Sequence, residues 1–199
     1  MTRPFLIGLT GSIGMGKSTT AEMFAEEGAA VWDADAAVHR LYARGGAAVA
    51  PMQRRFPGAV NEAGVDRGAL KELIAEDPSV LKQIEAIVHP LVAADRAAFI
   101  AARPADVLVL DIPLLFETGS ADQFDLVAVV SAPPELQRAR VLARPGMTAA
   151  QFETILAKQL PDAEKRARAD VVIPTETLEG ARKVVREIMA QARGEAEDA

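Results

Sequence analysis

A glycine-rich segment near the start of the chain carries residue types that hold phosphate groups. Its pattern is G-x-x-x-x-G-K-[ST], formed by Gly11, Ser12, Ile13, Gly14, Met15, Gly16, Lys17 and Ser18, with Thr19 next. Backbone N–H groups of such a loop surround phosphate oxygens, and its lysine reaches the β- and γ-phosphates. This P-loop predicts binding of ATP, with Ser18 as a ligand of Mg²⁺. A plain glycine-rich turn is the alternative, which the expected strand before it and helix after it disfavour.

Three aspartates follow apolar runs, where ligands meet an open α/β sheet. Asp33 and Asp35 follow one run, and Asp111 follows another. Asp33 is predicted to accept or orient the proton of an acceptor hydroxyl, and Asp111 to hold Mg²⁺ directly or through water. Helix capping is the alternative for Asp33 and the favoured role for Asp35. A turn role is the alternative for Asp111.

Basic side chains for the transferred phosphoryl group come later in the chain. Arg138, Arg140 and Arg144 are expected on one helix, and the spacing of the last two places them on one helical face. Such arginines can stabilise charge on the transferred group, and a solvated basic face is the alternative. His39 and His89 fit a structural cap or a packed position better than catalysis.

The elements that must position these residues form an alternating pattern. Five continuous apolar runs predict buried parallel strands: Phe5–Leu9, Ala30–Trp32, Val107–Leu110, Leu126–Val130 and Val171–Ile173. Because helical patterns separate them, the predicted class is α/β with a five-stranded parallel sheet.

Two long excursions interrupt this alternation. Residues about 34–102 predict helices without a confident strand, one capped by Asp66 and another ending before Pro90. Since one helix suffices for a crossover, we expect a helical insertion within a single 199-residue domain. Residues about 134–162 form the second excursion, in which Thr148 and Gln151 predict a capping box. A last helix is expected from about 178 to 191.

Composition excludes several classes of function. The formal net charge of −6 disfavours a nucleic-acid binder, which needs a basic face. The absence of cysteine excludes disulfides and thiolate chemistry. Without a signal peptide or a membrane-spanning apolar run, a cytoplasmic protein with small-molecule partners is expected. The sequence does not determine the oligomeric state, with which a monomer is compatible.

Further motifs extend the pattern along nearly the whole chain, and with them the sequence resembles the dephospho-CoA kinase family. The motifs are Gly8-Leu9-Thr10-Gly11, Asp33-Ala34-Asp35, Asp66-Arg67 with Leu70, Val88-His89-Pro90, Asp111-Ile112-Pro113-Leu114-Leu115-Phe116-Glu117, and then Gln137, Arg140, Arg144, Gln159, Lys165 and Ala169-Asp170.

The resemblance implies a three-layer P-loop kinase fold with a helical acceptor-binding insertion and a helical lid. It implies transfer of the ATP γ-phosphoryl group to the ribose 3′-hydroxyl of dephospho-CoA, with Asp33 as base and Arg140 and Arg144 as phosphate clamps. The lid would be the segment around Gln137–Gln159. Acceptor contacts implied besides Asp33 are Arg67, His89, Leu114, Leu115 and Glu117.

The sequence departs from the family in two places. Ser12 and Met15 replace a glycine and a small residue, and Met15 is expected to contribute only its backbone N–H. Pro174-Thr175 stand where an asparagine often lies near adenine. Two other functions stay open: another small-molecule P-loop kinase, with a nucleoside monophosphate or sugar hydroxyl acceptor, and a regulatory nucleotide-binding protein.

Overall fold

The computed structural model describes residues 3–102 and 105–198 of the chain. These residues fall into two compact units. One unit is Asp33–Ala102, and the other, the α/β unit, contains the described residues on either side of it. Each unit has its own hydrophobic core, which is the usual mark of a separately packed body.

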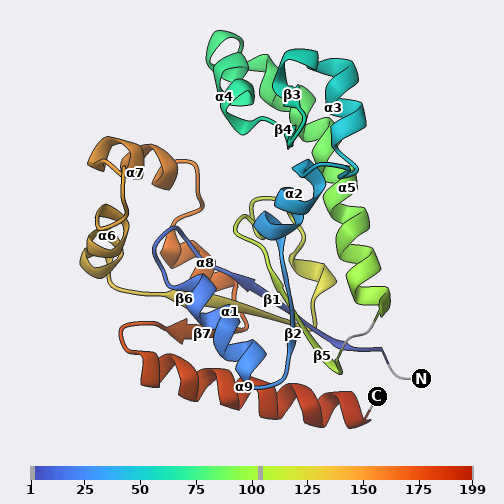
Figure 1. The fold of residues 1–199 in the computed structure, drawn as a ribbon. Helices are drawn as coiled ribbons and strands as arrows, with labels where there is room; N and C mark the ends of the chain where they lie inside the picture. Colours follow the sequence, from blue (N-terminus) through green and yellow to red (C-terminus); the bar gives the residue numbers. More distant parts are fainter. Residues whose placement is uncertain (1–2, 103–104, 199) are drawn as a thin grey trace. The chain divides into compact units, whose positions relative to one another are not determined.

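A five-stranded parallel sheet forms the centre of the α/β unit, in the order β2-β5-β1-β6-β7 (Figure 1). The strands are β1 (Phe5–Thr10), β2 (Ala30–Asp33), β5 (Val107–Asp111), β6 (Leu126–Ser131) and β7 (Val171–Pro174). The predicted class and all five strands are therefore confirmed. Each strand ends one residue later than predicted, because hydrogen-bonded pairing continues past the last apolar side chain.

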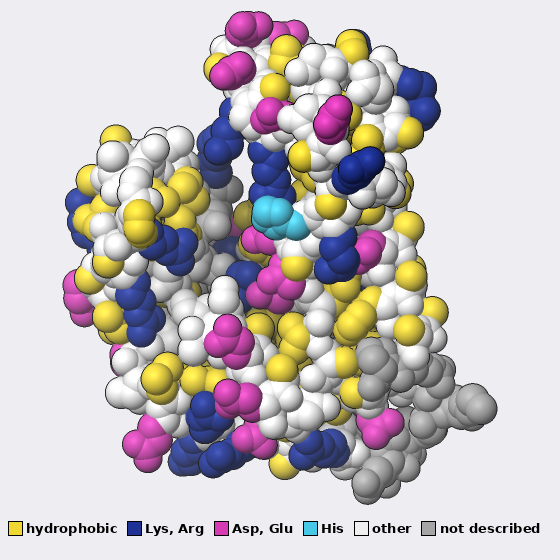
Figure 2. All heavy atoms as spheres, in the orientation of Figure 1, with side chains coloured by type: hydrophobic (Ala, Val, Ile, Leu, Met, Phe, Trp, Pro, Cys, Tyr) yellow, Lys and Arg dark blue, Asp and Glu magenta, His cyan; other side chains and the backbone are white. Residues whose placement is uncertain are grey.

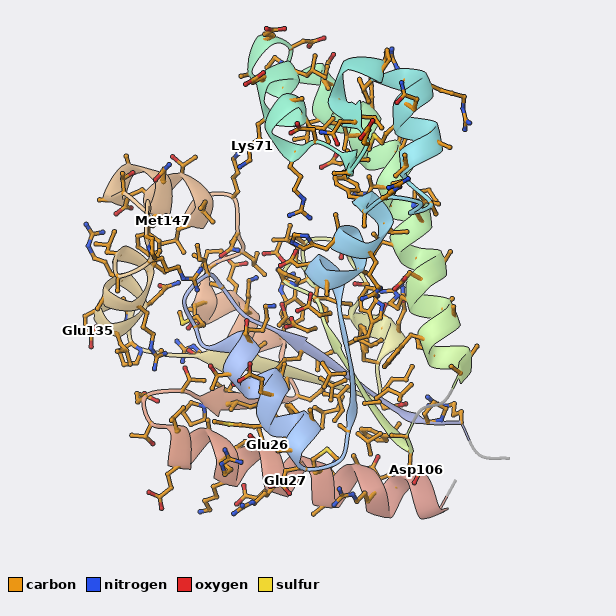
Figure 3. The ribbon with its side chains drawn as sticks, in the orientation of Figure 1. Glu26, Glu27, Lys71, Asp106, Glu135 and Met147 are labelled. Carbon is orange, nitrogen blue, oxygen red and sulfur yellow. The ribbon has the colours of Figure 1, made fainter. Side chains whose placement is uncertain are left out.

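Two helices pack together beside this sheet. They are α1 (Lys17–Glu26) and α9 (Leu178–Asp198), and α9 also contacts β7, β1 and β5. Figure 3 shows Glu26 and Glu27 at the end of α1 on the side of α9, where Glu26 pairs with Arg182 and Glu27 with Arg186. The last helix is longer than predicted, since its apolar stripe continues to the buried Ala192.

The second predicted excursion contains two helices and a connecting turn. The helices are α6 (Pro134–Leu142) and α7 (Ala149–Leu156), and α8 (Asp162–Arg168) follows and packs against β6. The predicted capping box of α7 is confirmed, because Thr148 Oγ1 accepts a hydrogen bond from Gln151 N and Gln151 Oε1 accepts one from Thr148 N. A short 3₁₀ helix, Ala121–Gln123, lies between β5 and β6.

The Asp33–Ala102 unit is mainly helical. It contains α2 (Ala34–Tyr42), α3 (Val49–Arg55), a 3₁₀ helix (Pro57–Ala59), α4 (Arg67–Glu76) and α5 (Ser79–Ala102). Its core gathers buried side chains from these helices: Leu41, Met52, Phe56, Leu70, Val80, Ile84 and Val88. The predicted cap of α4 is confirmed, since Asp66 Oδ1 accepts hydrogen bonds from Gly68 N and Ala69 N.

Two expectations for this unit are wrong. The fifth helix does not end before Pro90 but continues to Ala102, because a proline removes only one backbone donor while Leu91 and Val92 still pack on the core. The unit also contains an antiparallel hairpin, β3 (Val60–Asn61) and β4 (Gly64–Val65). Two-residue strands are too short to show a periodicity in the sequence.

The surface carries both signs of charge. On the face shown in Figure 2, acidic and basic side chains are interspersed. Within the described ranges, 3–102 and 105–198, no helix has the length and apolar character that a membrane crossing requires.

Candidate active site

The P-loop connects β1 to α1 through backbone conformations that require glycine. Gly14 has φ of 77° and Gly16 has φ of 90°, the left-handed region that side chains with a Cβ rarely adopt. Gly16 is the N-cap of α1, and Lys17 is its first residue. The loop therefore ends at a helix N-terminus, where exposed N–H groups and the helix dipole favour an anion.

A buried ion pair lies at the base of this loop. Lys17 Nζ pairs with Asp111 Oδ1, and the two side chains are 16% and 1% exposed. Asp111 is the last residue of β5 and stands opposite Leu9 in the adjacent strand β1. The structure thus brings two predicted site residues into contact, and Lys17 neutralises a carboxylate that is removed from water.

Ser18 and Asp111 offer a hydroxyl and a carboxylate oxygen, which are hard ligands that suit Mg²⁺. A magnesium ion bound to a nucleotide keeps several water and phosphate ligands, so a small protein donor set fits it. Among the described residues no group of three or more His, Cys, Asp or Glu side chains could hold a metal ion.

The two unusual P-loop positions are both buried. The Met15 side chain is 2% exposed, and its Sδ lies 3.1 Å from Ala132 N, which donates to it. The Met15 side chain thus packs the loop against the residue that follows β6, and the expectation that Met15 offers only its backbone N–H to phosphate stays a prediction. Ser12 is 3% exposed, and its Oγ has no hydrogen-bond partner among the described residues.

Thr175, the first residue after β7, forms a hydrogen bond with the backbone of the P-loop. Its Oγ1 donates to Met15 O at 2.7 Å. Arg140 donates to the same residue, from Nη1 to Thr175 Oγ1 at 3.2 Å and from Nη2 to Thr175 O at 2.6 Å. The departure at Pro174-Thr175 therefore places a hydroxyl beside the P-loop. From the sequence, Thr175 was noted only as a departure from the family. Its position directly after a predicted strand could have marked it as a candidate site residue.

A cavity of about 340 Å³ lies beside these residues. Its lining includes Gly16, Thr19, Arg140, Arg144, Thr175 and Thr177. The volume lies in the range of small-molecule sites, and the cavity adjoins the helix end that favours phosphate. It can hold the nucleoside part of a nucleotide whose phosphates lie in the P-loop.

The three arginines do not share one helix or one role. Arg138 pairs with Glu153 Oε1 at 2.8 Å and lies over the Phe152 ring, so it links α6 to α7. Arg144 lies after the end of α6, not on it, because Ala143 is the C-cap. Its exposed side chain forms no hydrogen bond or ion pair with the residues that the structure describes.

Asp33 is the last residue of β2 and the N-cap of α2. Its Oδ1 accepts a hydrogen bond from Ala36 N at 2.7 Å. The capping role expected for Asp35 therefore belongs to Asp33, and Asp35 lies in the first turn of the helix. The helix is therefore capped two residues earlier than the favoured position, Asp35. Only one of the two Asp33 oxygens is used by the cap.

The segment after β5 places its predicted acceptor residues in different surroundings. Leu114 is 41% exposed, whereas Leu115 is fully buried and packs against Gly8. The prediction that Leu115 contacts the acceptor is therefore corrected to a core position. Glu117 Oε1 pairs with Lys165 Nζ at 2.9 Å and accepts a hydrogen bond from Leu160 N at 2.8 Å.

These two partners control the ionisation of Glu117. Burial works to raise the pKa of its carboxyl, but the hydrogen bonds from Lys165 and from Leu160 N outweigh burial, and the pKa is lowered. The Lys165 side chain is fully buried. Glu117 is thus held as a carboxylate that ties the end of the predicted lid to the segment after β5.

Within the helical unit, Arg67 forms a small polar cluster. Arg67 Nη1 lies 3.2 Å from His39 Nε2, and its guanidinium stands 5.6 Å from the centroid of the Tyr42 ring. Burial raises the pKa of the Tyr42 phenol, and the Arg67 charge offsets part of this rise. His89 lies exposed on α5. Sequence reasoning missed Tyr42, whose contact with Arg67 depends on packing.

Comparisons with known proteins point to one family. The family model for dephospho-CoA kinase matches residues 5–179. A dephospho-CoA kinase of Ruegeria pomeroyi is 65% identical over 95% of this chain and 96% of its own length. That of Cereibacter sphaeroides is 62% identical over 96% and 97%.

Solved structures share the architecture. A Thermus thermophilus protein is 35% identical with a TM-score of 0.83, covering 95% of this chain and 98% of its own. The dephospho-CoA kinase of Campylobacter jejuni, at 22% identity, has the same fold, with a TM-score of 0.64 over 94% and 96%. By the family model and these full-length relatives, the chain belongs to the dephospho-CoA kinase family.

Proposed function

We propose that the chain transfers the γ-phosphoryl group of ATP to the ribose 3′-hydroxyl of dephospho-CoA. A bond forms between the 3′-oxygen and the γ-phosphorus, the bond from that phosphorus to the bridging oxygen breaks, and ADP leaves. The observation that carries the proposal is the Lys17–Asp111 pair at the base of the P-loop, beside a cavity of about 340 Å³, in a chain of this family.

Lys17 is proposed to neutralise charge on the transferred group, which passes through a loose transition state. Phosphate binding would draw its ammonium from Asp111 toward the phosphates, which leaves the Asp111 carboxylate for a cation. Ser18 and Asp111 would hold Mg²⁺, which would supply positive charge to offset that of the nucleotide phosphates. Arg140 and Arg144 line the cavity and are proposed to act as phosphate clamps that close over the transferred phosphoryl group.

Asp33 is proposed to take the proton from the 3′-hydroxyl. Two observations support this: it ends β2, the strand next to β5 in the sheet, and its cap uses Oδ1 alone. Arg67, His89, Leu114 and Glu117 are proposed to contact or frame the acceptor. The unit Asp33–Ala102 would hold the acceptor, residues about 134–162 would act as a lid, and the reaction would take place in the cytoplasm.

The test is acceptor-dependent release of ADP. Purified protein with ATP and Mg²⁺ should release ADP at least tenfold faster with dephospho-CoA than with AMP, with a sugar alcohol or without acceptor, and coenzyme A should form in equal amount. Equal rates with all acceptors would contradict the assignment.

The Asp33 role has its own test. For Asp33→Asn we expect a loss of kcat on the order of 10²-fold with ATP binding kept, because the amide cannot accept the proton. The amide oxygen can still cap α2, so the melting temperature should stay close to that of the wild type. An unchanged kcat would remove the base assignment.

A further inference from the structure

Both backbone groups of one P-loop residue are held by glutamines from the predicted lid segment. Gln137 Nε2 donates to Ile13 O at 2.8 Å, and Ile13 N donates to Gln159 Oε1 at 3.0 Å. Gln137 lies on α6, and Gln159 lies between α7 and α8. We call these two hydrogen bonds the Ile13 clamp.

The clamp has a fixed polarity. A backbone N–H can only donate and a carbonyl can only accept, so Gln137 must present its amide nitrogen and Gln159 its amide oxygen. The backbone groups of an open loop cannot pair within a helix or a ladder, and side chains must satisfy them. Ile13 is therefore held on both sides of its Cα, and the two peptide planes that meet there are restrained together.

The two glutamines differ in how firmly they are seated. Gln137 is 5% exposed, and α6 packs directly on the loop: a Cβ at Gly14 would collide with a Val141 methyl group. Gln159 is only half-buried. Gln137 thus supports the loop from a buried position, whereas Gln159 reaches it from a more exposed connection.

A buried ion pair anchors that connection. Leu160, the residue after Gln159, donates its N–H to Glu117 Oε1, and the fully buried Lys165 pairs with the same oxygen. A continuous series of contacts therefore runs from Lys165 through Glu117 and Leu160 to Gln159 and Ile13. Figure 3 shows Met147 on the turn between α6 and α7. The segment therefore contacts the P-loop at both of its ends, through Gln137 on α6 and through Gln159 after α7.

We propose that Gln137 and Gln159 are positioning residues that set the direction of the Ile13 peptide groups in the phosphate cradle, and that Gln159 couples the lid segment to the P-loop. The inference rests on the proposed kinase function. Loop N–H groups hold phosphate only in a concave arrangement, and phosphoryl transfer depends on positioning more than on covalent chemistry. Losing either hydrogen bond lets the Ile13 peptides rotate while Lys17 stays in place.

Substitutions at Gln159 test the polarity of the clamp. Gln159→Met has a similar length but no acceptor, and we expect kcat at saturating ATP and dephospho-CoA to fall about tenfold, the effect of one lost hydrogen bond. Gln159→Glu keeps an acceptor oxygen for Ile13 N and should restore most of the lost kcat. Gln137→Met leaves Ile13 O without its donor and should lower kcat at least as much as Gln159→Met.

Gln151→Met is the matched control, because Gln151 lies in the same segment and its side chain bonds only to Thr148 among the described residues. Its kcat should equal that of the wild type. If the glutamines had only a structural role, the loss of kcat in each of the four variants would follow the decrease in its melting temperature. That result, or a wild-type kcat for Gln159→Met, would overturn the proposal, as would equal losses for Gln159→Met and Gln159→Glu.

Amide hydrogen exchange separates this inference from the proposed function. Without any substrate, the Ile13 amide should exchange slowly in the wild type and in Gln159→Glu, and at least tenfold faster in Gln159→Met. Equal exchange in all three proteins would refute the clamp. A wild type without dephospho-CoA-dependent ADP release would refute the proposed function instead, whatever the exchange rates.

Discussion

Two ion pairs of the α/β unit include a buried side chain, whereas the ion pair and the arginine cluster of the helical unit lie at the surface. Lys17–Asp111 and Lys165–Glu117 each include a side chain that is at most 1% exposed. In the helical unit, Arg40 and Asp95 are 55% and 25% exposed, and Arg67 is exposed beside His39.

This difference has a physical consequence for function. A buried charge needs an opposite charge beside it at every stage, so its neighbours are tightly constrained. An exposed charge keeps its hydration and its freedom, so it costs little to redirect toward a ligand. We therefore expect substitutions of buried pairs to change chemistry or folding, and substitutions in the helical unit to change acceptor binding.

The largest effect is expected for Lys17→Ala. Removing a charge aimed at the transferred group should lower kcat on the order of 10³-fold. The assay is ADP release at saturating ATP and dephospho-CoA, with circular dichroism to show that the variant is folded. Near-normal turnover in a folded variant would show that the buried pair with Asp111 is only structural.

Lys165→Met should mainly affect folding. It leaves the partly buried Glu117 carboxylate without its cation, and we expect a loss of about 3 kcal/mol in the free energy of unfolding, measured with urea. The exposed Lys158 is the matched control, and Lys158→Met should change this free energy by less than about 0.5 kcal/mol. Equal values for the two variants would contradict the role of the buried pair.

The same variant has a pH signature. The folded-state pKa of Glu117 is lowered, so its stabilising contribution is present above the unfolded value of about 4.3 and is lost as the pH falls through the folded-state pKa. The difference in free energy of unfolding between wild type and Lys165→Met should be constant near neutral pH and shrink below about pH 4. A difference that grows in acid would contradict the assigned partner.

Arg67→Ala tests the helical unit. Because the Arg67 guanidinium is exposed, we expect the KM for dephospho-CoA to rise about tenfold, the effect of a lost charged hydrogen bond, with kcat and stability largely kept. Arg54→Ala removes another exposed arginine of the same unit and should leave this KM unchanged. A similar rise in both variants would indicate a general effect of charge.

Arg40→Ala should have the smallest effect. The exposed pair with Asp95 should contribute less than about 1 kcal/mol to stability, and the contribution should decrease in high salt. Urea unfolding at low and high salt measures it. A loss as large as that for Lys165→Met would remove the contrast between the two units.

Local patterns in the sequence predicted those features that depend on neighbours along the chain. The P-loop, the capping box at Thr148, the helix cap at Asp66 and the five strands follow from residue types a few positions apart. The residue that caps α2 does not follow from such a local pattern, because β2 extends to Asp33. The sequence did not predict that α5 continues through Pro90, because packing of the helix on the unit's core outweighs the local effect of the proline. It did not predict the small hairpin either, because two-residue strands are too short to show a pattern.

The sequence by itself determined the phosphate-binding loop, the α/β class and the resemblance to a family of kinases, because glycine positions, apolar runs and motif order are written along the chain. Only the tertiary structure decided what surrounds that loop: Thr175 beneath Met15, Arg140 beside Thr175, and the glutamines at Ile13. Gln159 and Ile13 are 146 positions apart, and no short-range pattern pairs an amide with a particular peptide group over that distance. Such contacts exist because burial leaves each backbone donor and acceptor in need of a partner, and the folded chain supplies whichever polar side chain packing brings there.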